Sequence, residues 1–294
     1  MELKRLMLLP IIGLLAVSCT EEELSDAYGQ FEAVETVISA EASGRLQTFD
    51  VQEGDHLEAG RVIGQIDSTQ PALRKKELMA SLSSMRNRVS ELDAQAAIYR
   101  SQLQTAETEL ARLESLYSEN AATQQQIDAG RGQVETLNRQ IDAVEVQKQS
   151  VYSELETLQV RIEQVEDQLS KTVILNPVFG TVLNTFAEPH ELVTTGSPLY
   201  QIANLDEMIL RAYVSGAQLP GVQIGAAVDV LMDETATENR QLTGTVSWVS
   251  SEAEFTPRMI QTKEERVTQV YAVKIRVENP DGRIKIGMPG EVNF

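Results

Sequence analysis

Apolar side chains that recur in steps of three and four residues through the middle of the chain most constrain what this sequence can fold into. Such steps average about 3.5 residues, the period of helices that pack along a left-handed coiled-coil seam. The pattern runs in two stretches separated by a polar segment, and a charged residue, Lys148, interrupts it. We therefore expect two long helices that pack against each other. The seam positions are Leu78, Leu82, Met85, Val89, Leu92, Ala96, Tyr99, Leu103, Ala106, Leu110, Leu113 and Tyr117, then Val134, Leu137, Ile141, Val144, Val151, Leu155, Leu158, Ile162, Val165 and Leu169.

The polar segment between the two stretches, from Ser118 to Thr123, is a short turn. Two helices of matched length joined by a short turn run antiparallel, so residues 68–172 predict a coiled-coil hairpin. Arms of about 47 residues extend for about 70 Å at roughly 1.5 Å of rise per residue. Gly130 and Gly132 lie near the start of the second helix. Each costs about 1 kcal/mol relative to alanine in a helix, so we expect a looser tip.

The segments before and after the hairpin resemble each other at a fixed offset of 136 residues. In both, apolar and polar residues alternate, which predicts short, half-buried strands, and glycines mark the turns. Neither half is large enough to bury its apolar face alone. Residues 37–67 and 173–204 are therefore expected to close one β-sandwich across the hairpin. The offset pairs Gly44 with Gly180, Gly60 with Gly196, and Gln65-Ile66 with Gln201-Ile202.

In residues 205–277, short strand patterns alternate with regular turn signals, which predicts a small β-barrel. A short strand segment, 278–294, is expected to follow it. The expected strands are 209–214, 227–231, 242–249 and 270–277.

The N-terminus has the pattern of a secretory signal, with Lys4 and Arg5 ahead of an apolar run that is too short to span a membrane as a helix. Residues 15–18, which precede the only cysteine, Cys19, resemble a bacterial lipobox, although Ala16 stands where leucine is usual. The resemblance implies a signal peptide over 1–18, lipidation of Cys19 and a lipidated linker over 19–36. An uncleaved anchor with an incidental cysteine is the alternative.

Composition and motifs argue against several classes of function. A formal net charge of −19 repels nucleic-acid phosphates, so nucleic acid is not an expected partner. A single cysteine forms no disulfide within the chain, and the two histidines, His56 and His190, lack the spacing of a zinc site and fit solvated turns. No phosphate loop, nucleophile elbow or dinucleotide fingerprint occurs. The sequence therefore predicts a protein that is not an enzyme and needs no metal or cofactor.

These features together resemble the HlyD-like family of membrane fusion proteins, or periplasmic adaptor subunits. The resemblance is carried by the halves around Gly44 and Gly180, the turn Val51-Gln52-Glu53-Gly54-Asp55 and the hairpin between the halves. It implies a mixed α and β, elongated fold, in which a split biotinyl/lipoyl-like β-sandwich is interrupted by the hairpin and followed by a barrel. It also implies an adaptor of a tripartite efflux or secretion system, which links an inner-membrane exporter to an outer-membrane TolC-type channel.

The resemblance extends to the partners and the location of the protein. It implies a homo-oligomeric ring in the periplasm of a Gram-negative bacterium, held by the lipid anchor, with the inner membrane favoured. The loop from Phe255 to Arg266 resembles loops of adaptors that serve ABC-type exporters, and a proton-driven pump is the alternative. The chain ends at Phe294, so the membrane-proximal domain of longer relatives is expected to be short or missing.

The hairpin tip also resembles the family's channel-docking motif, an Arg, a Leu four places on and a Ser seven places beyond. Arg112, Leu116 and Thr123 stand at that spacing, with threonine keeping the hydroxyl. The plain alternative is that Arg112 is a solvated flank, Leu116 ends the seam and Thr123 caps the second helix.

Two other functions remain open. A biotin or lipoyl carrier would present a lysine in the turn between the halves, but Asp67 leads into the hairpin there, and Lys75, Lys76 and Lys171 lie at helix ends. A surface-exposed coiled-coil lipoprotein scaffold is the other, because Thr20-Glu21-Glu22-Glu23 after Cys19 resembles a surface-export signal.

Overall fold

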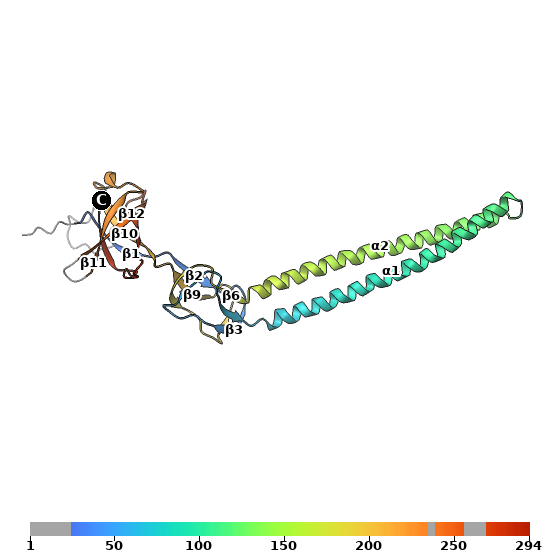
Figure 1. Cartoon of the computed structure of the whole chain (residues 1–294), viewed down its shortest axis with the longest axis horizontal. Coiled ribbons are helices and arrows are strands. Elements are labelled where there is room, and N and C mark those ends of the chain that lie inside the picture. The colour runs from blue at the N-terminus through green and yellow to red at the C-terminus, as the bar shows by residue number, and fades with distance from the viewer. Residues whose placement is uncertain (1–24, 235–238, 256–268) are drawn as a thin grey trace, which may run out of the picture. The chain divides into compact units, whose positions relative to one another are not determined.

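The computed structural model describes residues 25–234, 239–255 and 269–294. The chain folds into two compact units. One unit consists of residues 35–203. The other combines the chain up to residue 34 with residues 204–294, so segments from both ends of the chain fold together (Figure 1). Each unit is described by itself.

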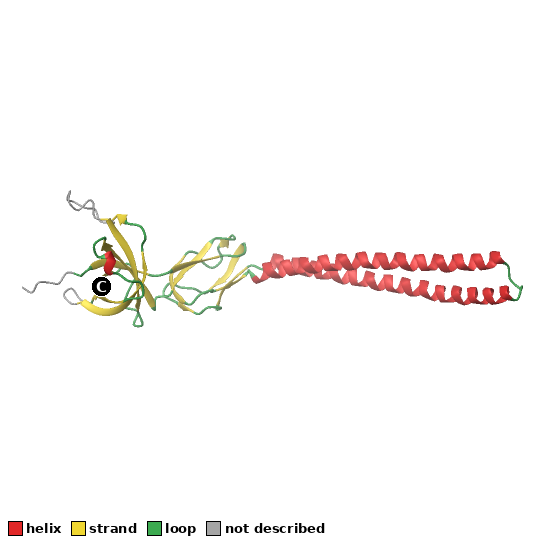
Figure 2. Ribbon diagram, turned by 90° about the horizontal axis from the view of Figure 1, so that it is seen from above, coloured by secondary structure: helices red, strands yellow, loops and turns green. Residues whose placement is uncertain are grey.

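Residues 35–203 form two four-stranded sheets and a helical hairpin (Figure 2). The sheets have the strand orders β2-β9-β7-β4 and β6-β5-β3-β8, and all pairs are antiparallel. The apolar side of each sheet packs into one shared core. The strands are β2 (Glu35–Ser39), β3 (Gly44–Phe49), β4 (His56–Leu57), β5 (Val62–Ile66), β6 (Val173–Leu175), β7 (Gly180–Thr185), β8 (Leu192–Val193) and β9 (Pro198–Ala203).

The repeat seen in the sequence is present in the strands, because β3, β4 and β5 recur 136 residues later as β7, β8 and β9. The turns recur as well. Gly54, at φ +90°, corresponds to His190, at φ +76°. His190 is thus a turn residue in the left-handed region, where a side chain is uncommon. This agrees with the expectation of a turn position.

The two halves exchange strands. In the first sheet the outer strands β2 and β4 precede the hairpin and the inner strands follow it, and in the second sheet this order is reversed. An equivalent backbone hydrogen bond joins the two halves in each sheet. Gly54 N donates to Val182 O at 2.9 Å, and His190 N donates to Leu46 O at 2.7 Å. Each half therefore needs the other to complete its hydrogen-bond ladder and its core.

A buried polar network at Asn176 also joins the halves. Asn176 is fully buried and its Nδ2 donates to Glu58 O at 2.8 Å and to Val178 O at 2.6 Å. The hydroxyl of Tyr200, equally buried, donates to Asn176 Oδ1 at 2.9 Å. Buried polar groups are stable only when bonded in this way. Burial raises the pKa of Tyr200 far above its usual value, so its phenol stays a donor.

The hairpin consists of α1 (Thr69–Ser118) and α2 (Gln124–Ser170). At roughly 1.5 Å per residue the arms are about 75 Å and 70 Å long. The predicted seam side chains are buried or half-buried along both arms, except Tyr117 at the end. Ion pairs join the beginning of one arm to the end of the other, which confirms the antiparallel arrangement. They are Lys75–Glu166 (2.9 Å), Asp93–Lys148 (2.7 Å), Arg100–Glu145 (2.7 Å) and Glu114–Arg131 (2.9 Å).

Lys148 shows how the seam accommodates a charge. Its Nζ lies 2.7 Å from Asp93 Oδ1 on the other arm and 5.9 Å from the centre of the Tyr152 ring. The hydrogen bond to Asp93 raises the pKa of Lys148, which keeps the ammonium charged. A polar residue at a seam position lowers the stability of a coiled coil but fixes its register. Lys148 therefore favours the register in which it meets Asp93.

The second unit is a closed barrel, which in the described residues has six strands in the order β10-β1-β15-β11-β12-β14, with β14 pairing back to β10. The short strand β13 extends the sheet beside the start of β14. The strands are β1 (Ala27–Glu32), β10 (Glu207–Ser215), β11 (Ala227–Asp233), β12 (Asn239–Val249), β13 (Glu254–Phe255), β14 (Gln269–Glu278) and β15 (Pro289–Asn293), and a 3₁₀ turn, η1, spans Leu219–Gly221.

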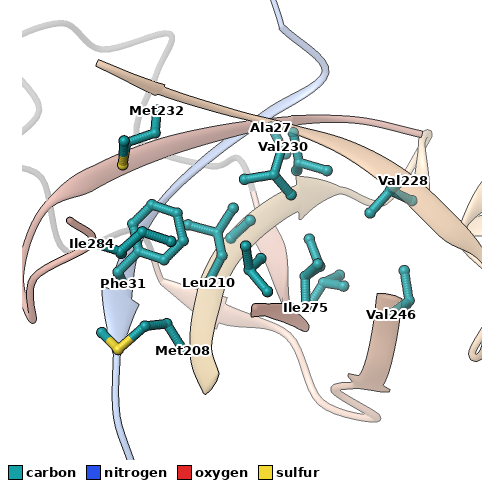
Figure 3. Packing of buried hydrophobic residues seen from close by; sticks show 14 of the residues in the cluster. Ala27, Phe31, Met208, Leu210, Val228, Val230, Met232, Val246, Ile275 and Ile284 are labelled. Atoms are coloured by element: carbon teal, nitrogen blue, oxygen red, sulfur yellow. The ribbon is translucent and has the colours of Figure 1, made fainter. Parts of the chain in front are cut away.

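Alternate side chains of these strands fill the barrel (Figure 3). Phe31, Leu210 and Ile275 are completely buried there. Gly290 lies where a Cβ atom would come within 2.7 Å of the Phe31 ring, so glycine lets the ring fill the interior.

The four strands expected in residues 205–277 are present, and the fold class is confirmed. The N-terminal and C-terminal segments differ from expectation. The sequence predicts a linker over 19–36 and a separate segment over 278–294, whereas β1 and β15 are neighbouring barrel strands with Gly29 opposite Gly290. A local pattern could not reveal this, because the partner of β1 lies at the other end of the chain.

We predict that Tyr200→Phe lowers the free energy of unfolding by about 1–2 kcal/mol, because Asn176 Oδ1 keeps its burial and loses its donor. Denaturant unfolding followed by circular dichroism measures this. Tyr28→Phe, on an exposed ring, is the control and should be neutral.

A comparison of the unsubstituted protein with Tyr200→Phe also tests the pH dependence of stability. The pKa of Tyr200 is raised in the folded chain, so its contribution to stability is complete below the ordinary value of 10.0 and is lost as the pH rises above it. The unfolding free energy of the unsubstituted protein should therefore fall more steeply above that pH than that of Tyr200→Phe. Parallel curves would contradict the assignment.

Candidate functional site

The closed end of the hairpin is built as a defined turn (Figure 1). Ala121 N donates to Leu116 O at 2.8 Å and Asn120 N donates to Tyr117 O at 3.0 Å, which ends α1. Asn120 takes φ +59°, a left-handed conformation that asparagine tolerates. The backbone thus reverses direction with the carbonyls of Leu116 and Tyr117 satisfied.

Thr123 begins the second arm with a capping box. Gln126 N donates to Thr123 Oγ1 at 3.4 Å, and Thr123 N donates to Gln126 Oε1 at 2.8 Å. Reciprocal bonds of this kind satisfy donors at a helix start. The cap role considered from the sequence is therefore confirmed for Thr123. Its hydroxyl is bonded within the turn.

Arg112 and Leu116 stand one helical turn apart, a spacing that places them on one face of α1. Leu116 is 36% exposed although it is apolar. Arg112 is exposed and its Nη1 lies 2.9 Å from Glu109 Oε2 on the same helix. Arg112 and Leu116 thus lie near the end of α1, and Thr123 lies at the start of α2. A docking role for them remains a prediction.

Tyr117 is a tip residue that the docking motif does not include. It occupies the last seam position of α1 and is 44% exposed. The signal was present in the sequence, because the seam extends to Tyr117 while the second arm begins only at Gln124. Leu116 and Tyr117 together give the tip an apolar surface.

Gly130 has a packing role at this end of the hairpin. A Cβ atom at Gly130 would lie 3.2 Å from Leu110 Cδ1 and 3.7 Å from Leu113 Cδ1, so the two arms approach closely there. Helix α2 continues through Gly130 and Gly132. The looser tip expected from these glycines stays a prediction, and in the structure Gly130 packs against Leu110 and Leu113 of α1. Ile127, one turn earlier, is buried and extends the seam.

The remaining candidate residues lie elsewhere. Cys19, the signal peptide and residues 256–266 of the proposed exporter loop fall outside the described residues. In the part of the chain that the structure describes, no group of three or more His, Cys, Asp or Glu side chains is placed to hold a metal. Over the same residues, no helix has the length and apolar character needed to cross a membrane.

The lysines considered for a carrier function lie at the base of the hairpin. Lys171 Nζ is 2.7 Å from Asp167 Oδ2, and Lys75 is paired with Glu166. Between the halves, Asp67 accepts hydrogen bonds from Thr69 N at 2.9 Å and Thr69 Oγ1 at 2.6 Å, which lower the pKa of its carboxyl. Asp67 thus helps to start α1 at this point of the chain.

The fold was compared with solved structures. MacA from Actinobacillus actinomycetemcomitans matches with a TM-score of 0.56 at 20% identity, over 92% of this chain and 78% of MacA. A membrane fusion protein from Streptococcus pneumoniae R6 matches with a TM-score of 0.57 at 14% identity, over 90% of this chain and 96% of that protein. The chain therefore has the fold of the membrane fusion proteins, also called periplasmic adaptors.

Among curated sequences, the chain is similar to the UPF0194 membrane proteins. The relative from Yersinia enterocolitica is 28% identical over 296 residues, covering 91% of this chain and 88% of the relative. No family model matches the chain. The resemblance to adaptors stated from the sequence is thus confirmed at the level of the fold.

We predict that Thr123→Ala destabilises the start of α2 by about 1 kcal/mol, because it removes the capping oxygen. Amide hydrogen exchange at Gln126 and Ile127 should speed up accordingly. Thr123→Ser keeps the oxygen and should retain protection. Equal protection in both variants would show that the cap contributes nothing.

Proposed function

We propose that this protein is a non-catalytic periplasmic adaptor that links an inner-membrane exporter to an outer-membrane TolC-type channel in a tripartite efflux or secretion system. The observation that carries the proposal is a hairpin of about 70 Å with exposed apolar side chains, Leu116 and Tyr117, at its closed end. A stiff arm with an apolar tip is suited to reaching a partner at a distance.

The construction of the arms supports a mechanical role. Their seam is apolar and their outer faces are mainly polar, and ion pairs are spaced along their length. Such a hairpin resists bending because its helices are continuous and packed throughout. A push or rotation at the sandwich would therefore be transmitted to the tip. We infer that the adaptor seals and relays movement while another subunit supplies the energy.

The proposed docking contact divides between apolar and charged groups. Leu116 would bury its side chain against the channel, and burial of apolar area is the main source of affinity at such contacts. The Arg112–Glu109 pair is solvent-exposed, and pairs of this kind contribute little stability, about 0–1 kcal/mol. Arg112 could therefore exchange Glu109 for an acceptor on the channel at small cost. Thr123 would keep the turn in shape.

Lipidated Cys19 would hold the protein at the periplasmic side of the inner membrane of a Gram-negative bacterium. We favour an ABC-type exporter as partner on the resemblance of the loop from Phe255 to Arg266, and a proton-driven pump is the alternative. Similarity to MacA supports the adaptor assignment through its fold.

Assembly into a ring of identical subunits belongs to the same proposal. Strand β2 is one edge strand of the first sheet and β6 is one edge strand of the second, and they border a groove of about 830 Å³ at the base of the hairpin. Val37 and Leu175, on these edges, are both about half exposed. Free strand edges with exposed apolar side chains are prone to pair with other chains. A neighbouring subunit packed on this groove would cover them.

The test is photo-crosslinking in cells from residue 116. A crosslinker in place of Leu116 should yield a product with the outer-membrane channel. Ile98, 58% exposed but halfway along α1, is the matched control and should yield no such product. Absence of the channel product from positions 116 and 117 alike, or equal yield from position 98, would refute docking through the tip.

Protease treatment of whole cells separates the adaptor from a surface scaffold. A periplasmic adaptor should be protected from added protease until the outer membrane is permeabilised. Degradation in intact cells would favour the surface-exposed scaffold.

A further inference from the structure

The outer face of the barrel over strands β1, β10, β14 and β12 has an unusual composition for so acidic a chain. It carries three aromatic residues and three basic residues, whereas the whole sequence has a formal net charge of −19. We name this surface the barrel face. Its residues are Tyr28, Arg211, Tyr213, Trp248, Lys274 and Arg276.

A β-bulge turns the only tryptophan of the chain onto this face. Val246 pairs with Ile275 and Trp248 pairs with Lys274, so β12 uses two residues where β14 uses one. Ser247 is the extra residue, and its Oγ donates to Lys274 O at 2.9 Å. Val246 faces the core, and without the bulge Trp248 would face it too, since alternate residues share a side. Trp248 is instead 42% exposed.

Bulges often re-aim a side chain at a functional position. An exposed tryptophan is expensive for a soluble surface, because a large apolar ring stays in water. The bulge therefore indicates that Trp248 serves a contact rather than the fold.

The neighbouring residues extend the contact surface. Tyr28 is 43% exposed and pairs in register with Tyr213. The guanidinium carbon of Arg211 lies 5.8 Å from the centre of the Tyr213 ring, and Lys274 Nζ lies 5.5 Å from that of Trp248. Arg211 and Lys274 are register partners, and each of these cations lies beside an aromatic ring.

Acidic residues limit the positive charge around the face, and at the Tyr28 end Glu291 of β15 is the register partner of Tyr28. Glu254 binds Arg211 through both carboxylate oxygens, at 3.0 Å and 2.9 Å, and neutralises it. Glu207 and Glu278 face each other at one end of the β10–β14 pair, next to Glu32 on β1. Lys274 and Arg276 provide the positive charge in the middle. Aromatic rings beside lysine and arginine are the side chains that proteins place at membrane interfaces.

The chain itself brings this face close to a membrane if Cys19 is lipidated. Tyr28 follows Cys19 by nine residues, which extend over about 30 Å at most. A lipid on Cys19 would hold the barrel near the membrane but would not fix its orientation. Contacts made by the barrel face would supply the orientation.

We propose that the barrel face lies on the headgroup layer of the membrane that holds the Cys19 lipid, with Trp248 and Tyr28 in the interfacial layer and Lys274 and Arg276 at anionic headgroups. This inference rests on the lipid anchor of the proposed function. It deepens that function by giving the adaptor a defined orientation at its base.

The test uses the chain from residue 19 onward with Cys19→Ser, so that neither lipid nor signal peptide contributes. Vesicles of phosphatidylethanolamine and phosphatidylglycerol are the probe, and vesicles of phosphatidylcholine are the comparison. Trp248 is the only tryptophan, so its emission reports this face alone. We expect a blue shift and quenching by brominated acyl chains with the anionic vesicles. Both effects should weaken in phosphatidylcholine and at high salt.

Substitutions test the residues individually. Lys274→Gln with Arg276→Gln should weaken vesicle partitioning by about fivefold for each charge removed. Arg86→Gln with Arg88→Gln, an equal charge change on exposed hairpin positions, is the matched control. Tyr28→Ser should weaken partitioning, and Tyr152→Ser, which removes an equally exposed ring from the hairpin, should not. Circular dichroism checks that each variant is folded.

Unchanged Trp248 emission with every vesicle, or equal losses in the control variants, would overturn the proposal. The proposal would also be overturned if a crosslinker at position 248 captured a protein in cells and the purified protein did not bind the vesicles. This result would show that the face docks on a protein such as the exporter. The vesicle measurement involves neither exporter nor channel. Its failure would therefore leave the test at Leu116 standing, and failure at Leu116 would not affect it.

Discussion

The exchange of strands between two distant halves of the chain is the constraint on which the rest of this structure depends. Each sheet takes its outer strands from one half and its inner strands from the other, and both halves fill one core. Strand β5 leads into α1 and β6 follows α2, and these two strands pair, with Ile66 N donating to Thr172 O at 2.8 Å. This exchange of strands, which we call the clasp, therefore brings the start of α1 and the end of α2 together.

The sequence could predict the parts of the fold that rest on a repeated local pattern. The three- and four-residue steps from Leu78 onward predicted the hairpin and its seam, and the offset between Gly44 and Gly180 predicted the split sandwich. It could not place β1 and β15 in the barrel, because their pairing joins segments more than 250 residues apart. Single-residue effects were also hidden. The sequence does not show that Gly130 packs against Leu110 of the seam, and the bulge at Ser247 depends on the register of β14.

The candidate site divides in the same way. The spacing of Arg112, Leu116 and Thr123 could be read directly, and so could the cap at Thr123, because a capping box is a local motif. The exposure of Tyr117 depends on where the second arm begins, whereas the pairing of Arg112 with Glu109 is a local contact within α1. In both units, large apolar side chains stay at the surface next to charged ones. These two surfaces are the ones for which we propose contacts, the hairpin tip with a channel and the barrel face with a membrane.

The most direct test of the clasp is a disulfide across it. His56 of β4 and Thr181 of β7 are register partners on opposite sides of the hairpin in sequence, and antiparallel partners have Cα atoms about 4.5–5.5 Å apart, close enough for a disulfide. In a Cys19→Ser background, His56→Cys with Thr181→Cys should oxidise to one bond within the chain, identified by mass spectrometry of the linked peptides. The pair His56→Cys with Thr185→Cys, further along β7, should stay reduced. Failure of the first pair to link, or linkage only between chains, would contradict the account.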